Sequence, residues 1–268
     1  MSNMVVMAVA SHPDDIEYAM AGTMLMLQKA GCEVHYMNVA NGSLGTEKYD
    51  YDTIVKMRRE EAVNAAKLAS FHFHDAICDD LEVFYNIELL GKLIPVVREV
   101  KPSILLTHGP YDYMEDHVNA GRLGVGAAFC RGMQNFKCAY PAKKYEGDIT
   151  VYHCMPHSIS DWLRRPVIPG IFVDIETTIE MKKDMLACHK SQQSWLDVSQ
   201  GINAYTQDLI DRGVYYGKLS GKYKFAEGWI RHNHQGFCPQ DADPLTRILA
   251  PNAFVNEEFE ESIKVHMP

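Results

Sequence analysis

The sequence has no long apolar run and no cluster of lysine and arginine, and these two absences exclude two classes of protein. No stretch approaches the roughly eighteen uncharged apolar residues that a membrane-spanning helix needs, so we expect no association with a membrane. Lys and Arg total 26 against 35 for Asp and Glu, which gives a net charge of -9 over 268 residues. Because such a surface repels a polyanion unless a basic patch offsets it, we expect no nucleic-acid partner.

Cysteine pairing motifs are also absent. The seven cysteines are odd in number and none forms a CxxC pair, which favours buried, reduced thiols over disulfides or a structural zinc knuckle. The apolar segment 1–10 has no lysine or arginine ahead of it and leads directly to His12, so we interpret it as a first strand rather than a signal peptide. A cytoplasmic protein is the resulting expectation.

Apolar runs of strand length alternate with helix-like segments, most clearly in the first half of the chain. This alternation predicts an α/β fold with a Rossmann-like, mostly parallel sheet and helices on both faces. Ligands of such sheets bind at the carboxyl edge of the strands, where we therefore expect the site. The predicted strands are 4–10, 34–40, 71–77, 103–107, 149–153 and 171–174, and the predicted helices are 18–30, 51–69, 87–100, 116–129, 176–189 and 203–212.

Domain organisation is predicted to be simple. The chain shows no internal repeat, low-complexity tract or linker, so we expect a single domain over 1–268. The portion from about 193 is harder to interpret. It contains an aromatic stretch at 215–237 and an acidic end at 256–268, which we expect to wrap the surface or a neighbouring molecule.

The strongest chemical signal follows the first predicted strand. A His and an Asp three residues apart on a turn that enters a helix, His12 and Asp15, can face the same point and offer zinc an imidazole nitrogen and a carboxylate oxygen. Pro13 fixes the backbone between them, and Asp14 would point elsewhere, free to take a proton. The alternative is that Asp14 or Asp15 only caps the helix.

A third ligand must come from another loop, because catalytic zinc usually has three protein ligands and one open position. His117 lies after the strand predicted at 103–107, on the same edge of the sheet. Asp116 precedes it, and the ordinary alternative for such an Asp is the N-cap of the following helix.

The segment 12–17, His-Pro-Asp-Asp-Ile-Glu, resembles the HPDDE motif that opens the PIG-L/LmbE-like N-deacetylases. The acid at the end of that motif is displaced by one position here, to Glu17. The resemblance implies that His12 and Asp15 are metal ligands and that Asp14 is the general base.

Further motifs of that family follow in the same order, and together they cover about 4–192. Substrate-binding roles are implied for an Arg-x-x-Glu helix, a glycine loop after the second strand and a late His-x-Ser-Gln motif. An Asp-His pair supplies a further catalytic residue and the third metal ligand. These positions are Arg58 with Glu61, Gly42 and Ser43 in the loop 41–45, His189, and Asp116 with His117.

One position departs from the family pattern. Many relatives carry His-x-Asp-His, whose first His is thought to steady the developing oxyanion, and this chain has Met114 there. Another residue must take the acid or oxyanion role, or the activity differs. The candidates are His108, Tyr111, Tyr113, His232 and His234.

The function implied by the resemblance is removal of an acetyl group from an N-acetylglucosamine-type or related N-acyl substrate by a metal-activated water. An amino-sugar conjugate is the expected small-molecule partner. The ligand set suits Zn²⁺ and tolerates Fe²⁺ or Co²⁺, and relatives often form trimers or hexamers. Two alternatives stay open, namely a hydrolase of a different amide or ester and a catalytically silent metal- or sugar-binding protein.

Overall fold

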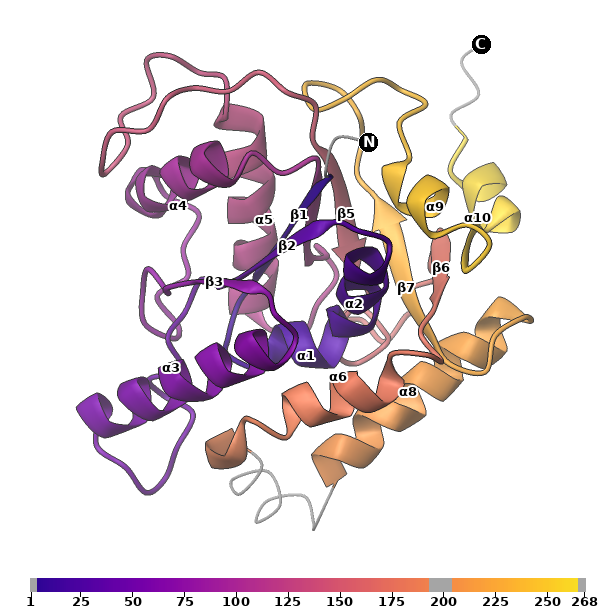
Figure 1. Ribbon diagram of the computed structural model, residues 1–268, viewed down its shortest axis with the longest axis horizontal. Helices are drawn as coiled ribbons and strands as arrows, with labels where there is room; N and C mark the ends of the chain where they lie inside the picture. Colours follow the sequence, from indigo (N-terminus) through magenta and orange to yellow (C-terminus); the bar gives the residue numbers. More distant parts are fainter. Residues whose placement is uncertain (1–3, 193–203, 265–268) are drawn as a thin grey trace.

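A computed structural model describes residues 4–192 and 204–264, and within them one eight-stranded sheet forms the centre of the molecule (Figure 1). Its strands lie in the order β3-β2-β1-β4-β5-β7-β6-β8. Their bounds are β1 (Val5–Ala10), β2 (Glu33–Asn38), β3 (His72–His74), β4 (Ile104–His108), β5 (Thr150–Cys154), β6 (Ile171–Asp174), β7 (Ala226–Arg231) and β8 (Ala253–Val255).

The sheet is parallel from β3 to β5 and antiparallel at its other end. The pairs β2–β3, β1–β2, β1–β4 and β4–β5 are parallel, whereas β5–β7, β6–β7 and β6–β8 are antiparallel. The predicted fold class, a mostly parallel Rossmann-like sheet, is therefore confirmed.

Helices cover both faces, as predicted. Two helices share an apolar cluster with one face, α4 (Ile87–Val100) and α5 (Glu115–Cys130). The larger cluster on the other face takes in most of the remaining helices. These are α1 (Asp15–Ala19), α2 (Ala21–Lys29), α3 (Tyr51–Leu68), α6 (Ile179–Leu186), α8 (Ala204–Ser220) and α9 (Pro244–Leu249).

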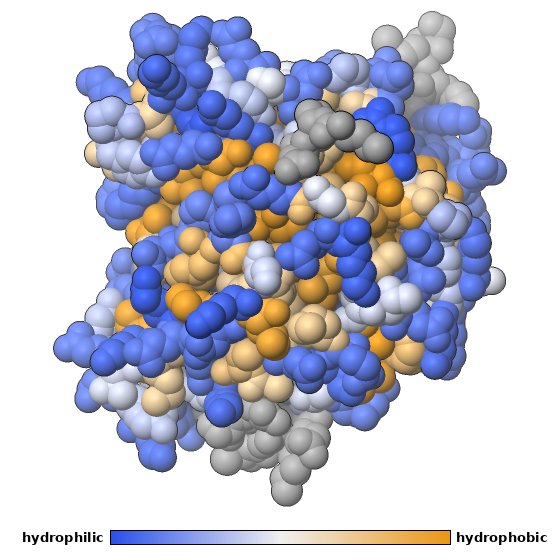
Figure 2. Space-filling view, in the orientation of Figure 1, coloured by the Kyte–Doolittle hydropathy of each residue, from blue (hydrophilic) through white to orange (hydrophobic). Residues whose placement is uncertain are grey.

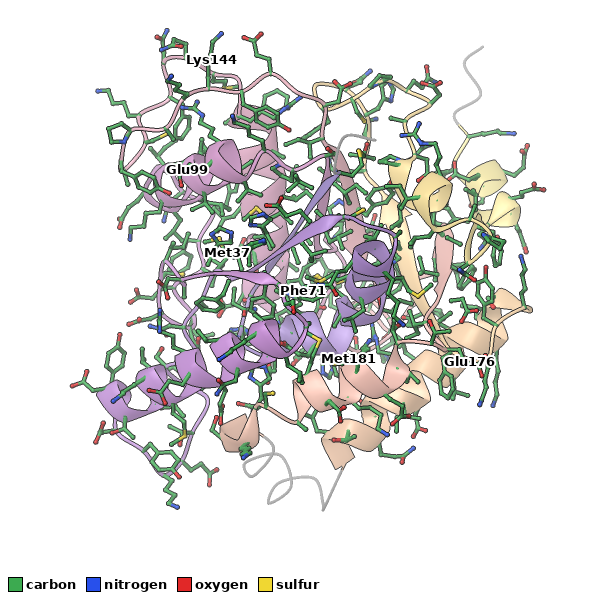
Figure 3. All side chains as sticks on the ribbon, viewed as in Figure 1. Met37, Phe71, Glu99, Lys144, Glu176 and Met181 are labelled. Carbon is green, nitrogen blue, oxygen red and sulfur yellow. The ribbon has the colours of Figure 1, made fainter. Side chains whose placement is uncertain are left out.

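The central strand β1 shows why the sheet is buried on both sides. Its side chains alternate between the two clusters, Val6 and Ala8 in one and Met7 and Val9 in the other, and all four are fully buried. Figure 3 likewise places Met37 in the interior and Lys144 at the periphery. In Figure 2 the hydrophobic residues visible on this side gather in the middle of the face, and the margins are mostly hydrophilic.

Several element boundaries differ from the predictions. The helix predicted at 18–30 is two helices that meet at Met20, whose φ of -131° is not helical. The strand predicted at 71–77 is confined to β3, and the helix predicted at 176–189 spans only α6. Within the stretch 215–237, α8 continues to Ser220 and β7 follows, a strand that the sequence pattern did not reveal.

The predicted C-terminal segment 256–268 is in part a surface helix. It forms α10 (Glu257–Ser262), which has no buried residue and whose first-turn acids lie at the helix end that favours negative charge. Residues 193–203 and 265–268 lie outside the described part of the chain. Within residues 4–192 and 204–264, no helix combines the length and the apolar character needed to cross a membrane.

A buried ion pair joins three elements on the α2 face of the sheet. Lys182 on α6 lies 2.6 Å from Glu227 on β7, and the two side chains are only 3% and 5% exposed. The Glu227 carboxylate also accepts the backbone N–H groups of Gly22 and Thr23, 2.9 and 2.7 Å away, in the first turn of α2. The pair therefore satisfies the start of that helix as well as its own charges.

We expect Lys182→Met to destabilise the protein by about 3–5 kcal/mol, because it leaves the Glu227 charge buried and unpaired. The matched control is Lys183→Met, next in the chain, whose partner Glu180 is 79% exposed. That exposed pair is expected to contribute less than about 1 kcal/mol. Denaturant unfolding measures both changes, and equal losses would contradict the role given to the buried pair.

Candidate functional site

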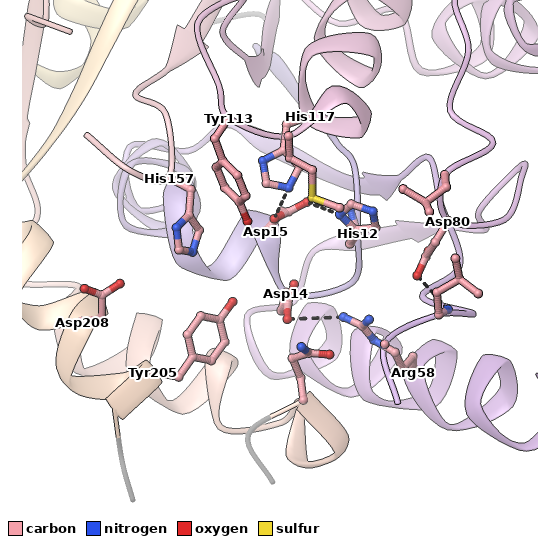
Figure 4. Close-up of a pocket in the computed structure, with 15 residues that line it drawn as sticks. His12, Asp14, Asp15, Arg58, Asp80, Tyr113, His117, His157, Tyr205 and Asp208 are labelled. Carbon is pink, nitrogen blue, oxygen red and sulfur yellow. Dashed lines mark hydrogen bonds and ion pairs between the residues drawn. The ribbon is translucent and has the colours of Figure 1, made fainter. Parts of the chain in front are cut away.

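A pocket of about 330 Å³ lies where the loops after β1, β2 and β4 meet α8 (Figure 4). This is the carboxyl edge of the parallel strands, where the site was predicted. The residues that line it are His12, Asp14, Asp15, Leu44, Gly45, Arg58, Asp80, Leu81, Tyr113, Met114, His117, His157, Gln192, Tyr205 and Asp208.

The turn after β1 separates the two adjacent aspartates. Asp15 begins α1, and its Oδ2 accepts the backbone N–H of His12 at 2.6 Å and lies 3.3 Å from His12 Nδ1. Asp14 occupies the N-cap position with a φ of 112°, and its side chain makes no capping hydrogen bond. A non-glycine residue held in this left-handed region stores strain, a feature that clusters at functional sites. Neither carboxylate serves as the helix cap that was the alternative reading.

His117, in the first turn of α5, reaches the same carboxylate from the other side. Its Nε2 lies 3.3 Å from Asp15 Oδ1, and the ring centroids of His12 and His117 are 5.4 Å apart. One ligand atom from each of the three residues lies within 4.8 Å of the others. The structure thus brings His12, Asp15 and His117 together so that they could hold one divalent cation.

A second carboxylate orients each of these imidazoles. His12 Nε2 lies 3.1 Å from Asp116 Oδ2, and His117 Nδ1 lies 3.1 Å from Asp112 Oδ1. Each ring therefore presents its other nitrogen to Asp15. A carboxylate behind a metal-binding histidine fixes the tautomer and raises the basicity of the ligand.

The structure excludes the N-cap role for Asp116 and adds Asp112 to the residues of the site. Asp116 does not cap α5, because its Oδ2 accepts the backbone N–H of Leu81 at 2.7 Å while it faces His12. Asp112 was missed from the sequence. Its position in the loop after the fourth strand, close to His117, is the signal that could have found it.

The electrostatics of the cluster fit a cation. Burial disfavours the charged form of His12, but the hydrogen bonds with Asp116 and Asp15 outweigh this and raise its pKa to about 9. The pKa of His117 is also raised, because Asp15 and Asp112 overcome the effect of burial. The three carboxylates Asp15, Asp112 and Asp116 therefore favour positive charge on the two imidazoles. A divalent cation bound to two neutral imidazoles would supply the same positive charge.

Asp14 faces Arg58 rather than the cluster (Figure 4). Its Oδ2 lies 3.3 Å from an Arg58 guanidinium nitrogen, and the same guanidinium group donates to the carbonyl of Pro13. Burial raises the pKa of Asp14 to about 6, although the positive charge of Arg58 opposes the shift. A carboxyl with such a pKa is suited to exchange a proton near neutral pH.

The glycine loop after β2 encloses Arg58. Gly42 has a φ of +80°, and a Cβ there would lie 2.5 Å from Arg58 Cδ. Asp80 holds this loop by accepting the backbone N–H groups of Gly42 and Leu44, 2.7 and 3.0 Å away. Ser43, predicted to bind substrate, instead accepts the backbone N–H of Asp80 and does not line the pocket.

His189, also predicted to bind substrate, lies behind the pocket wall. Its Nε2 is 3.3 Å from Glu17 Oε1, and both side chains are fully buried. Glu17, the displaced acid of the opening motif, also accepts the hydroxyl of Tyr36 at 3.2 Å. The sequence Ser-Gln that follows His189 is closer to the pocket, because Glu61 on α3 accepts the Ser191 backbone N–H at 2.8 Å and Gln192 lines the cavity.

The candidates for the acid or oxyanion role fall in different places. Tyr113 lines the pocket beside Met114, whereas Tyr111 is exposed and does not. His108 is buried within the cluster. Its ring stacks on His117 with centroids 4.4 Å apart, and its Nε2 accepts the backbone N–H of Ser11 and lies 3.4 Å from Asp15 Oδ2.

The two late histidines do not line the pocket. His232 Nδ1 lies 2.9 Å from His153 Nε2 at the antiparallel β5–β7 junction, and His153 in turn lies 2.8 Å from the carbonyl of His108. His234 makes backbone hydrogen bonds in the loop that follows β7.

His157 is a pocket residue that sequence reasoning missed. Its ring stacks on Tyr18 at 4.2 Å, and its backbone N–H donates to Asp112 at 3.1 Å. Burial and the nearby Arg212 lower its pKa to about 4, so it is neutral at pH 7. It follows β5 at the carboxyl edge, so the rule that located the other loops could have found it.

Fold and site together define an α/β protein with a buried two-histidine, one-carboxylate centre at the carboxyl edge of a parallel sheet. The family model described as PIG-L: GlcNAc-PI de-N-acetylase matches residues 7–128. The diacetylchitobiose deacetylase of Thermococcus kodakarensis is 30% identical over 230 residues, which cover 83% of this chain and 81% of that protein. The chain belongs to the PIG-L family.

Two further comparisons show the breadth of these relatives. The 4-oxalmesaconate hydratase of Pseudomonas putida is 26% identical over 78% of this chain and 79% of that one. The solved structure of the N,N'-diacetylchitobiose deacetylase of Pyrococcus horikoshii superimposes with a TM-score of 0.72 at 22% identity, covering 86% of this chain and 84% of that one. The relatives of this chain thus include proteins named for two different reactions.

The His153–His232 pair gives a pH-dependent term in stability. Burial lowers the pKa of His153 to about 4. Between about pH 6.5 and 4 the imidazole is protonated in the unfolded state but stays neutral in the folded state. The contribution of His153 to the free energy of unfolding is therefore complete above about pH 6.5 and declines as the pH falls. We expect the difference in unfolding free energy between the wild type and His153→Gln to become smaller as the pH falls from about 6.5 to 4.

Denaturant unfolding with EDTA present, repeated at several pH values, measures this difference. His72→Gln is the control for the loss of one imidazole, because that side chain is 61% exposed and its replacement leaves no buried cavity. A His153→Gln difference that widens on acidification would contradict the neutral buried state.

Proposed function

We propose that this protein is an N-deacetylase that hydrolyses the acetamide of an N-acetylglucosamine-type substrate with the help of a divalent cation. The observation that carries the proposal is the convergence of His12, Asp15 and His117 at one point of a pocket, with the Asp14 carboxyl beside them. The relationship to a diacetylchitobiose deacetylase supports this reaction and this substrate class.

His12, Asp15 and His117 would hold the cation. Two imidazoles and one carboxylate form a donor set that suits Zn²⁺ and tolerates Fe²⁺ or Co²⁺. When bound, such a cation acidifies a water molecule and stabilises negative charge on the carbonyl oxygen. Asp116 and Asp112 keep each imidazole in the tautomer that ligation requires.

Asp14 is the general base in this proposal. It accepts a proton from the water that adds to the amide carbonyl, and it returns that proton to the amine nitrogen as the C–N bond breaks, which leaves acetate and a free amine. Its raised pKa places both protonation states within reach near neutrality. Arg58 orients the carboxyl and keeps it from turning toward the helix end.

Two other residues that line the pocket supply the polar groups that Met114 lacks. Tyr113 offers a hydroxyl, and neutral His157 offers a ring N–H. Their rings meet edge to face with centroids 5.9 Å apart. We propose that they donate hydrogen bonds to the acyl oxygen or to the leaving group, which a Met side chain cannot do.

The far side of the pocket is suited to a sugar. Tyr205 and Asp208 on α8 lie opposite the histidine–carboxylate cluster (Figure 4). Gln192 lines the same cavity, and its buried Oε1 has no hydrogen-bond partner among the described residues. Aromatic faces and carboxylate or amide oxygens are the groups that stack on a pyranose ring and accept from its hydroxyls. We therefore propose an amino-sugar conjugate as substrate.

We also propose that residues 1–268 form a single domain. The portion beyond 193 supplies β7 and β8 to the central sheet and α8 to the pocket. Localisation in the cytoplasm and assembly into trimers or hexamers stay predictions.

Asp14→Asn is expected to keep the cation and to lower kcat by about 10²–10⁴-fold, because the amide cannot accept the proton. Acetate release from a panel of N-acetylated mono- and disaccharides measures turnover, and elemental analysis measures the metal. Asp52→Asn, an exposed position on α3, controls for the loss of one charge and keeps wild-type turnover. Normal turnover by Asp14→Asn would show that another group is the base.

Gly42→Ala is expected to lower kcat/KM by about 10–100-fold, because the new Cβ displaces Arg58 and with it the Asp14 carboxyl. Gly31→Ala is the matched control. It has the same kind of backbone, with a φ of +91°, but no atom within 4 Å of the added Cβ. Both variants lose about 1–2 kcal/mol of stability from the left-handed backbone, so a comparable fall in activity for both would contradict the specific role of the glycine loop.

The relative named 4-oxalmesaconate hydratase makes hydration of a carbon–carbon double bond the second candidate reaction. The specific observation in its favour is Met114, which stands where the deacetylase pattern has a histidine. A loss of ultraviolet absorbance from an unsaturated tricarboxylate such as 4-oxalmesaconate, with no acetate released from any N-acetylated sugar, would favour the hydratase.

A further inference from the structure

Four metal-binding side chains lie together on the outer strands of the sheet. Glu33 and His35 belong to β2, and His72 and His74 belong to β3. The two strands are parallel, with His35 opposite His72 and Met37 opposite His74. Because alternate residues of a strand share a face, all four side chains project from the same face of the sheet.

Their polar atoms approach one another closely. His35 Nε2 lies 3.0 Å from Glu33 Oε1, and His72 Nε2 lies 3.9 Å from the same oxygen. One ligand atom from each of Glu33, His35 and His72 lies within 4.8 Å of the others. On the opposite side of the His35 ring, Nδ1 lies 2.8 Å from His74 Nε2.

Glu33, His35 and His72 form a set of three potential ligands, and His74 contacts the other ring nitrogen of His35. When His35 Nδ1–H donates to His74, the Nε2 lone pair faces the Glu33 carboxylate, and two electron-rich atoms then lie side by side. A metal ion between them relieves that contact. When no metal is present, the opposite tautomer places the His35 Nε2–H on Glu33, so loading changes the tautomer of His35 and leaves its charge unchanged.

Burial and hydrogen bonding hold His35 in position to be a ligand. Its side chain is only 10% exposed, and its two ring nitrogens lie 3.0 Å from Glu33 and 2.8 Å from His74. A metal binds the neutral form of an imidazole. The exposed side of the cluster, formed by Glu33 and His72 at 44% and 61% exposure, leaves an entry path from solvent.

We propose that Glu33, His35 and His72 form a second divalent-cation site, for Zn²⁺ or a similar nitrogen-preferring metal, and that His74 orients His35 within it. None of the four residues lines the pocket at the carboxyl edge. Glu33 lies at the beginning of β2, opposite Val5 at the beginning of β1. The three proposed ligands thus lie in the amino-terminal half of their strands, and the cluster does not depend on the proposed deacetylase chemistry.

A cation held there would join β3 to β2. β3 has three residues, and within residues 4–192 and 204–264 it pairs with no strand other than β2. A metal that binds side chains of both strands stabilises their pairing without adding backbone hydrogen bonds. The bound ion would have a structural role, because it cross-links β2 and β3 at the edge of the sheet.

The test is a metal count on protein without a polyhistidine tag. The full chain is stripped with EDTA, desalted and dialysed against buffered micromolar free Zn²⁺, and bound zinc is measured by mass spectrometry. We expect about two zinc ions per chain for the wild type and about one for His72→Asn. His117→Asn, which disables the pocket ligands, should also retain about one, and the double variant should retain none.

The control is His234→Asn, the same substitution outside both clusters, which is expected to keep both ions. Because His72 is exposed, His72→Asn should have the wild-type Tm in EDTA. Zn²⁺ should raise the Tm of His117→Asn through the second site, and this increase should be absent when His72→Asn is added. Wild-type zinc content in His72→Asn, or no zinc in His117→Asn, would overturn the second site. Loss of the pocket zinc alone would leave the second site standing, so the two proposals fail separately.

Discussion

One carboxylate organises the candidate centre, and the rest of the site depends on it. Asp15 lies 3.3 Å from a nitrogen of His12, 3.3 Å from one of His117 and 3.4 Å from one of His108. Burial alone would raise the pKa of Asp15, but the surrounding imidazoles hold it well below its usual range, so the group stays ionised. A buried charge of this kind is costly unless it is fully paired. The loops after β1 and β4 are held together by that requirement.

The surrounding charged residues orient the two histidines and the second aspartate of the turn. Asp116 and Asp112 stand behind the two histidines, while Arg58 holds the second aspartate of the turn away from the cluster. Adjacent carboxyls thus acquire opposite properties: burial raises the pKa of Asp14, and histidine contacts lower that of Asp15. Environments that push neighbouring pKa values apart are a recognised way for one site to supply both a ligand and a proton acceptor.

The sequence predicts the parallel half of the fold well because each βα unit there has its own local pattern. His12, Asp15 and His117 could be assembled from one rule, that loops after parallel strands meet at one edge. The antiparallel end was not foreseen, because Ala226–Arg231 mixes polar and apolar residues without alternation and its pairing with β5 and β6 is entirely long-range. Tyr205 was missed for a related reason, since its place in the site depends on a helix distant in sequence. The rule for loops at the carboxyl edge also covers Asp112 and His157, but it does not say which side chains of a loop face the site.

The pocket is built from two parts of the chain. His12, Asp15 and His117 lie within residues 7–128, the segment that the family model matches, whereas His157, Tyr205 and Asp208 lie beyond it. Substitutions in α8 can therefore alter the shape and polarity of one wall of the pocket while the cluster of His12, Asp15 and His117 stays in place.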